Sequence, residues 1–247
     1  MIEVTAASLS FKNDHSVNQV LKDVSFRVEP DSCCAIIGPS GCGKTSLLFL
    51  LAGLRRPDSG KITITGSPRS ATILQNYGLF PWKTVTQNIS LGLVLKKVDS
   101  EIVKKRTAEL LREMGLSGFG DYYPVQLSGG MQQRVALARA LAVEPEILFM
   151  DEPLSSLDAL SRERLQNLIL TIQQSKKITI VLVTHSIEEA VFLGHKIIVL
   201  SKSPGQILQI VNNPEAGSRE HRQQDIFFQR CKALRHLLKE EYGGQET

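Results

Sequence analysis

Hydrophobic and polar positions alternate with different periods along the chain, and each period predicts a type of element. Residues 2–28 alternate apolar and polar side chains, which predicts two or three antiparallel strands with a polar turn at residues 12–18. Continuous apolar runs at 35–37 and 147–150 predict strands that are buried on both faces, and a further buried strand is expected at 178–183. Shorter strands are expected at 61–65, 71–74, 196–200 and 206–211. These strands, separated by helical patterns, predict an α/β fold.

Helical spacing of apolar residues fills most of the intervals between the strands. The pattern predicts helices at 45–54, 86–95, 100–114, 159–174 and 187–193, and one opened by residues 127–134 that runs to about 143. No strand signal occurs between 75 and 146, so we expect an α-helical subdomain at 87–134 inserted into a core formed by 1–86 and 135–211. In the polar tail, 212–247, Phe227, Cys231, Leu234 and Leu238 form one stripe, which predicts a docked amphipathic helix.

Composition restricts the class of protein only mildly. The 247 residues include 42% hydrophobic and 22% charged side chains, as in an ordinary globular protein. A net charge of +4 does not indicate nucleic-acid binding. No apolar run approaches a membrane span, and the N-terminal residues show no signal-peptide pattern.

Cysteines and most histidines carry no chemical signal. The four cysteines have neither metal nor disulfide spacing, so we expect buried thiols in a reducing compartment. Cys33 and Cys34 are neighbours on a strand and should point to opposite faces. We interpret the histidines at positions 15, 195, 221 and 236 as solvated surface groups.

A phosphate-binding loop follows the first buried strand. Residues 38–45, GPSGCGKT, fit the pattern G-x-x-x-x-G-K-[ST] between a strand and a helix. Backbone N–H groups of such a loop point inward and, with the start of the helix, form a cradle for anionic oxygens. Lys44 would reach the β- and γ-phosphates and the Thr45 hydroxyl would bind Mg2+. The alternative, a glycine-rich turn with a surface lysine, is disfavoured by the flanking elements.

Two carboxylates end a second buried strand. Asp151 and Glu152 follow the apolar run 147–150, and open α/β sheets place ligands at the carboxyl ends of their strands. Asp151 would hold Mg2+ through water, and Glu152 would accept the proton of an attacking water. The alternative is a strand that merely ends in surface charges.

Three further features fit a phosphate site less specifically. Ser128, Gly129 and Gly130 open a helix with exposed N–H groups that suit an anion, although most such caps only start helices. His185 lies just past the end of a buried strand, where a γ-phosphate sensor would lie, although a lone histidine is usually structural. Phe11 is as consistent with stacking on a base as with a core position.

Together these segments resemble the nucleotide-binding subunit of an ABC transporter, a P-loop NTPase with a RecA-like core, an antiparallel β subdomain and an inserted α-helical subdomain. The resemblance covers about residues 2–211. It is carried by GPSGCGKT at 38–45, Gln75, LSGGMQQR at 127–134, ILFMDEP at 147–153, SSLD at 155–158 and His185.

The resemblance implies ATP and Mg2+ as cofactors and a head-to-tail dimer with two ATP molecules between the copies. Catalysis would involve Glu152, His185 and Gln75, and the metal would lie at Thr45, Gln75 and Asp151. The nucleotide would contact Phe11, Gly38, Ser40, Gly41, Cys42, Gly43, Lys44, Thr45 and Ser46 of one copy, and Ser128, Gly129 and Gly130 of the other, with Asp158 at the interface.

Transport would require a separate integral membrane permease subunit, and the resemblance also implies a solute-binding protein in the complex. Gln75 would report the phosphate state to Tyr77, Leu79, Phe80 and Trp82, which lie in the family beside the groove for the membrane subunit; for Trp82 a bland core cluster is the alternative. The sequence is most similar to ATPases of nitrate, sulfonate and taurine importers, which places it at the cytoplasmic face of the membrane. The other hypotheses are a non-transport ABC ATPase and an unrelated P-loop enzyme.

Overall fold

A six-stranded sheet forms the centre of the molecule in the computed structural model, which describes residues 1–13, 16–155 and 157–243. Its strand order is β5 (Ser70–Ile73), β6 (Ile147–Asp151), β7 (Thr179–Val183), β3 (Cys33–Ile37), β8 (Lys196–Leu200) and β9 (Ile207–Asn212). The first five are parallel and β9 is antiparallel at the edge. Every residue of β3, β6 and β7 is buried, as the sequence predicts.

A second, antiparallel sheet has the order β2 (Ser16–Val28), β1 (Ile2–Asn13) and β4 (Ser59–Ile64). Helix α1 (Lys44–Leu51) packs between this sheet and the central one. Cys34 and Ile36 of β3 face this core, whereas Cys33, Ala35 and Ile37 face the core on the other side of the sheet. The two neighbouring cysteines therefore point to opposite faces, and all four thiols are buried, as predicted.

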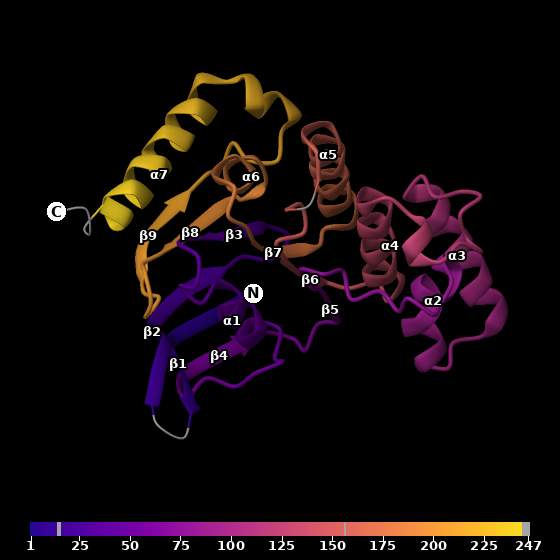
Figure 1. Cartoon of the computed structure of the whole chain (residues 1–247), viewed down its shortest axis with the longest axis horizontal. Helices are drawn as coiled ribbons and strands as arrows, with labels where there is room; N and C mark the ends of the chain where they lie inside the picture. Colours follow the sequence, from indigo (N-terminus) through magenta and orange to yellow (C-terminus); the bar gives the residue numbers. More distant parts are fainter. Residues whose placement is uncertain (14–15, 156, 244–247) are drawn as a thin grey trace.

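The predicted helical segment projects from one side of the sheet (Figure 1). It contains α2 (Val85–Leu95), α3 (Ser100–Glu113), the 3-10 turn Pro124–Gln126 and α4 (Gly129–Ala142). Thr84 and Gln87 form a capping box that starts α2, and the Asp99 carboxylate caps α3. Helix α4 then leads into β6, so the segment is joined to the sheet at β5 and at β6.

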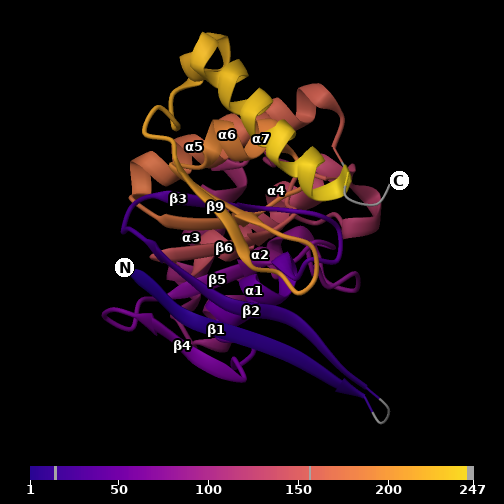
Figure 2. The same cartoon turned by 90° about the vertical axis from the view of Figure 1, so that its left-hand side faces the viewer.

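The remaining helices cover the face of the sheet opposite α1. They are α5 (Ala159–Lys176), α6 (Ile187–Leu193) and α7 (Asp225–Gly243), with a 3-10 turn at Arg219–Gln223. Helix α7 crosses this layer (Figure 2) and buries Phe227, Cys231 and Leu234, while Leu238 packs against them. The predicted amphipathic tail helix is confirmed.

Two predictions about polar residues are wrong. The first hairpin continues through most of residues 12–18, because Lys12 pairs with Val17 and Asn13 with Ser16; ladder hydrogen bonds sustain a strand without apolar side chains. His221 is fully buried with its ring edge-on to Phe227 at 5.4 Å, because the tail folds over it. His195 is also partly buried, and its Nδ1 accepts a hydrogen bond from the Cys33 N–H. Position 15 lies outside the described residues, and His236 is exposed as predicted.

Within the described residues, no helix combines the length and the apolar character that a bilayer span requires.

Candidate functional site

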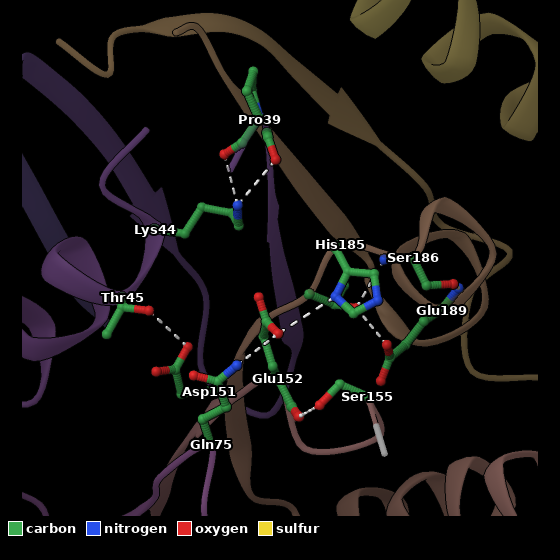
Figure 3. Close-up of polar contacts among 12 residues, drawn as sticks. Pro39, Lys44, Thr45, Gln75, Asp151, Glu152, Ser155, His185, Ser186 and Glu189 are labelled. Carbon is green, nitrogen blue, oxygen red and sulfur yellow. Dashed lines mark hydrogen bonds and ion pairs between the residues drawn. The ribbon is translucent and has the colours of Figure 1, made fainter. Parts of the chain in front are cut away.

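The predicted phosphate-loop, metal and catalytic residues gather at the carboxyl ends of four adjacent parallel strands (Figure 3). The phosphate loop follows β3, Gln75 follows β5, Asp151 and Glu152 end β6, and His185 follows β7. Residues that are up to 147 positions apart in the chain (38 to 185) therefore meet at one edge of the sheet. The structure thus brings together the residues that the sequence places at separate strand ends.

The phosphate loop surrounds its own lysine. Lys44 is buried, and its Nζ donates to the carbonyl oxygens of Gly38 at 3.0 Å and Pro39 at 2.8 Å. A cavity of about 250 Å³ opens over the loop. It is lined by Val20, Ser40, Gly41, Gly43, Lys44, Thr45, Ser46 and Glu152. An ammonium group and a helix start at one cavity favour an anion.

The loop glycines are required by geometry at two positions. Gly43 has a φ of 97°, and a Cβ there would lie 2.8 Å from the Val20 side chain. A Cβ on Gly38 would lie 2.9 Å from both the Cys42 sulfur and the Leu200 carbonyl oxygen. The loop is therefore held tightly between β2 and β8, and larger residues at either position would displace it.

Thr45 and Asp151 provide oxygen atoms suited to Mg2+. The Thr45 hydroxyl donates to the Asp151 carboxylate at 3.1 Å. Burial raises the pKa of Asp151, and the hydrogen bond from Thr45 lowers it. Among the described residues no group of three His, Cys, Asp or Glu side chains could hold a metal. Mg2+ commonly binds through one or two protein oxygens, with phosphates and waters completing its shell, so this pair fits the ion.

Glu152 has a strained backbone conformation directly after the buried strand. Its φ is 45°, a left-handed value that is uncommon outside glycine. The conformation is held by hydrogen bonds from the Glu152 N–H to Val183, and to the Glu152 carbonyl from the Ser155 N–H and hydroxyl. Such strain concentrates at functional sites, and here it turns the carboxylate toward the cavity over the loop.

Gln75 and His185 both contact the Glu152 carboxylate. Gln75 Nε2 donates to Glu152 Oε2 at 3.1 Å, and His185 Nδ1 lies 3.4 Å from the same oxygen. A base, an amide and an imidazole that share one oxygen can orient a water molecule and respond together to a bound phosphate. The predicted catalytic residues therefore form one contact network in this chain.

The predicted Ser128–Gly130 site lies elsewhere. Ser128 is the exposed N-cap of α4 and accepts from the Met131 N–H at 3.3 Å. Ser128 and Gly130 line a separate cavity of about 350 Å³ between α4 and α5, and its described lining shares no residue with the cavity over the phosphate loop. Asp158, also exposed, caps α5 by accepting from the Ser161 N–H at 3.0 Å.

Phe11 lies at the edge of the hairpin core rather than on the cavity lining. The Arg55 guanidinium covers its ring, with Cζ 4.1 Å from the ring centroid. A base that stacked on this ring would meet the guanidinium at the same face or take the opposite one. Stacking on Phe11 stays a prediction.

One contact that the sequence did not reveal joins helix α4 to the segment that follows Gln75. Arg139 of α4 donates to the carbonyl oxygens of Tyr77 and Gly78, each at 2.6 Å, just after Gln75. Its guanidinium also lies 6.0 Å from the Phe80 ring centroid. The helix that begins at Ser128 therefore holds the segment that carries Gln75. An arginine in an amphipathic helix gives no sequence signal for such a contact.

Comparison with known proteins gives the same family throughout. The family model described as "ABC transporter" matches residues 21–155. The taurine import ATP-binding protein TauB of Pelagibacter ubique is 46% identical, over 79% of this chain and 76% of that protein. The aliphatic sulfonates import ATP-binding protein SsuB of Bacillus thuringiensis is 38% identical, over 98% of this chain and 97% of its own length.

Solved structures agree with the fold. A dimeric structure of the ATP-binding cassette MJ0796 in a post-hydrolysis state with ADP and Pi superposes with a TM-score of 0.78 at 29% identity, over 86% of this chain and 98% of that one. A second dimeric structure of MJ0796 has the same TM-score at 31% identity. The predicted nucleotide-hydrolase fold is confirmed by these neighbours.

Proposed function

Because this chain belongs to the ABC transporter family, whose ATP-binding subunits are ATPases, we propose that two copies of it close on ATP and drive solute import through a separate membrane permease. The observation that carries the proposal is the convergence of Lys44, Thr45, Asp151 and Glu152 at one edge of the sheet, with Gln75 and His185 on the Glu152 carboxylate.

Each residue has a distinct role in the proposed reaction. The loop N–H groups and Lys44 would bind the phosphates, and Thr45 and Asp151 would hold Mg2+, which would supply positive charge beside the phosphates. Glu152 accepts a proton from the attacking water. Gln75 and His185 hold the Glu152 carboxylate and contact the water and the γ-phosphate.

The site is proposed to be completed by a second copy. One chain offers two anion-binding helix starts, at the phosphate loop and at Ser128, but the carboxylate pair lies only at the first. Two chains facing each other would place both kinds of helix start on every ATP. Closure would exclude water and strengthen each electrostatic contact, and hydrolysis would then place like charges in the interface and favour opening.

An exposed aromatic surface beside Gln75 is proposed to contact the permease. Trp82 is 69% exposed and packs edge-on to Phe80, with ring centroids 5.6 Å apart. Exposed Leu74 and partly buried Leu79 lie in the same segment. A bland core position for Trp82 does not agree with this exposure. The segment is joined to Gln75 through the chain and to α4 through Arg139, so phosphate binding and permease contact would be coupled.

The solute class is inferred from the names of the relatives, which import taurine and aliphatic sulfonates. We propose a sulfonate-type or related importer, with a solute-binding protein in the complex and this subunit at the cytoplasmic face of the membrane. The alternatives, a non-transport ABC ATPase and an unrelated P-loop enzyme, would lack a permease, and co-purification with a membrane protein separates them from the proposal.

A mixing experiment tests the shared site. Lys44→Ala should lose ATP affinity and Ser128→Trp should bind ATP but not turn it over, so each pure variant is inactive. In a mixed dimer one site carries both lesions and the other carries neither. Random mixing should therefore restore about a quarter of wild-type turnover, since half the dimers are mixed and each has one intact site of two.

The matched control mixes Lys44→Ala with Glu152→Gln. Both lesions lie in the same half of the site, so every site of the mixed dimer carries one and no turnover should return. Equal recovery in both mixtures, or none in the first, would overturn the two-copy site. Full activity of Ser128→Trp alone would indicate a self-sufficient single-chain NTPase.

A further inference from the structure

The turn that presents His185 is tied to a carboxylate buried behind it. Glu189 lies on the first turn of α6, is 3% exposed, and accepts a hydrogen bond from the Thr184 hydroxyl (Figure 3). Thr184, 1% exposed, directly precedes His185. Glu189 has no place in the proposed chemistry, yet it is one of the few buried charged side chains in the chain.

The hydrogen bonds around His185 form a directed chain. The Ser186 N–H donates to Thr184 Oγ1 at 3.1 Å, across His185, and the Thr184 hydroxyl donates to Glu189 Oε2. The Ser186 hydroxyl accepts from the Glu189 N–H at 3.2 Å and so caps α6. Because the residues on both sides of His185 are anchored, the backbone of His185 is fixed where its ring reaches Glu152.

Burial of the Glu189 carboxylate at the start of α6 lowers the stability of the fold. No described residue donates to its second carboxylate oxygen, Oε1, which is fully buried. A buried acceptor without a partner costs stability, whereas an apolar side chain would avoid that cost. The hydroxyl of Ser186 already caps the helix, so capping alone does not explain the carboxylate.

We propose that Glu189 is a positioning residue for ATP hydrolysis: through Thr184 it holds the turn that sets His185 against the Glu152 carboxylate. The inference rests on the proposed role of His185. Glu189 itself touches neither nucleotide nor water. Its ionised form accepts the Thr184 hydrogen, and protonation weakens that acceptor and loosens the turn.

The surroundings of Glu189 place its titration near neutrality. The pKa of Glu189 is raised to about 7, and burial is the largest cause. The Glu152 carboxylate also raises it, whereas the Thr184 hydrogen bond and Arg162 of α5 offset part of the rise. The Cys33 thiol of β3 also faces it, and burial raises the pKa of that thiol well above its usual range. A carboxylate close to half-ionised at neutral pH makes the hold on the turn sensitive to pH.

The test compares steady-state ATPase kinetics of Glu189→Gln, Thr184→Val and Thr184→Ser. Glu189→Gln leaves only a neutral amide acceptor for the Thr184 hydroxyl, and Thr184→Val removes the donor. Both variants should therefore lower kcat about tenfold, with KM for ATP unchanged because the phosphate loop is untouched. Thr184→Ser keeps the hydroxyl and should restore kcat. The double variant Glu189→Gln, Thr184→Val should be no slower than Thr184→Val alone, since both changes act on the same bond.

The pH dependence of kcat distinguishes a positioning role of Glu189 from a merely structural one. Wild-type kcat should fall with decreasing pH across the Glu189 titration, and that limb should be absent from Glu189→Gln. Glu163→Gln, which removes an exposed carboxylate from α5, is the control and should keep the wild-type rate and profile. Equilibrium binding of ATP, measured separately, should be unchanged in every variant and so reports correct folding.

Different outcomes separate this inference from the function on which it rests. If His185→Ala keeps wild-type turnover, the proposed role of His185 is wrong. If His185→Ala loses turnover but Glu189→Gln and Thr184→Val keep both the wild-type kcat and its pH profile, the positioning role of Glu189 is wrong. Loss of ATP binding in Glu189→Gln and in Thr184→Val would likewise overturn it, because the effect would then be on folding.

Discussion

The two anion-binding regions of this chain differ in how completely one copy assembles them. At the phosphate loop, elements from four strands converge, Lys44 and Asp151 are buried, and Glu152 is held in a strained conformation. At the start of α4, Ser128 and Gly129 are exposed and the cavity beside them contains neither carboxylate of the pair. The first region combines a buried lysine with both carboxylates, whereas the second offers an exposed helix start without a carboxylate of the pair.

The comparison also shows why the connection between the regions matters. Arg139 joins α4 to the segment after Gln75 through two hydrogen bonds of 2.6 Å. Any movement of the helical segment that follows binding at Ser128 would therefore reach Gln75 and, through it, Glu152. The pre-assembled region and the incomplete region are separate in space but are joined through α4, both by Arg139 and by the packing of α4 on the sheet.

The largest expected effect comes from removing the base in the assembled region. Glu152→Gln keeps a hydrogen-bonding side chain but cannot accept a proton, so turnover should fall by about 10³-fold while ATP binding remains. Since ATP then persists, size-exclusion chromatography should show an ATP-dependent dimer. A monomer that hydrolyses ATP at the normal rate would remove Glu152 from the mechanism and, with it, the distinction between the two regions.

A second prediction concerns the free energy of unfolding that the chain loses by burying Glu189 next to the assembled region. Because the folded pKa of Glu189 is about 7 and its ordinary value is 4.5, folding favours the protonated form, so its contribution is present below about pH 4.5 and is lost as pH rises through 7. At about 1.4 kcal/mol per pKa unit, Glu189→Gln should gain up to about 3 kcal/mol over wild type above pH 7.

Chemical denaturation at about pH 5 and about pH 8 checks this value. The advantage of Glu189→Gln should be small at the lower pH and large at the higher one. Glu163→Gln should show no such trend, because an exposed ion pair contributes little. An advantage that stays constant with pH would mean that Glu189 keeps the same ionisation in the folded and unfolded chain.

The smallest expected effect concerns the contact between the regions. Arg139→Ala removes two charged hydrogen bonds, one to the partly buried Tyr77 carbonyl and one to the exposed Gly78 carbonyl, which should lower the free energy of unfolding by about 2 kcal/mol. Binding of ATP to the isolated chain should be unchanged, because Arg139 does not line the cavity over the phosphate loop. In the dimer, turnover should decrease, since movement of α4 would no longer be transmitted to Gln75. Unchanged turnover with reduced stability would show that the contact is structural only.

Much of the fold can be predicted from local patterns of apolar and polar residues. The buried parallel strands were predictable because a strand covered on both faces is mostly apolar. The phosphate loop was predictable because close contacts with Val20 and Leu200 require its glycines. The stripe in the tail predicted a docked helix for the same reason, since apolar side chains at helical spacing need a surface to cover them. The misjudged hairpin and His221 show the limit, because backbone pairing and burial by the tail leave no mark in hydropathy.

The sequence by itself determined the order of elements, the phosphate loop, the carboxylates at the end of β6 and the family. Only the tertiary structure decided that Gln75 and His185 share one oxygen of Glu152, that Glu152 has a positive φ, that Arg139 holds the Gln75 segment and that Glu189 is buried behind His185. The physical reason is that spacing along the chain fixes which strand or helix a residue belongs to, whereas distances between side chains depend on strand order and on the packing of helices far apart in sequence.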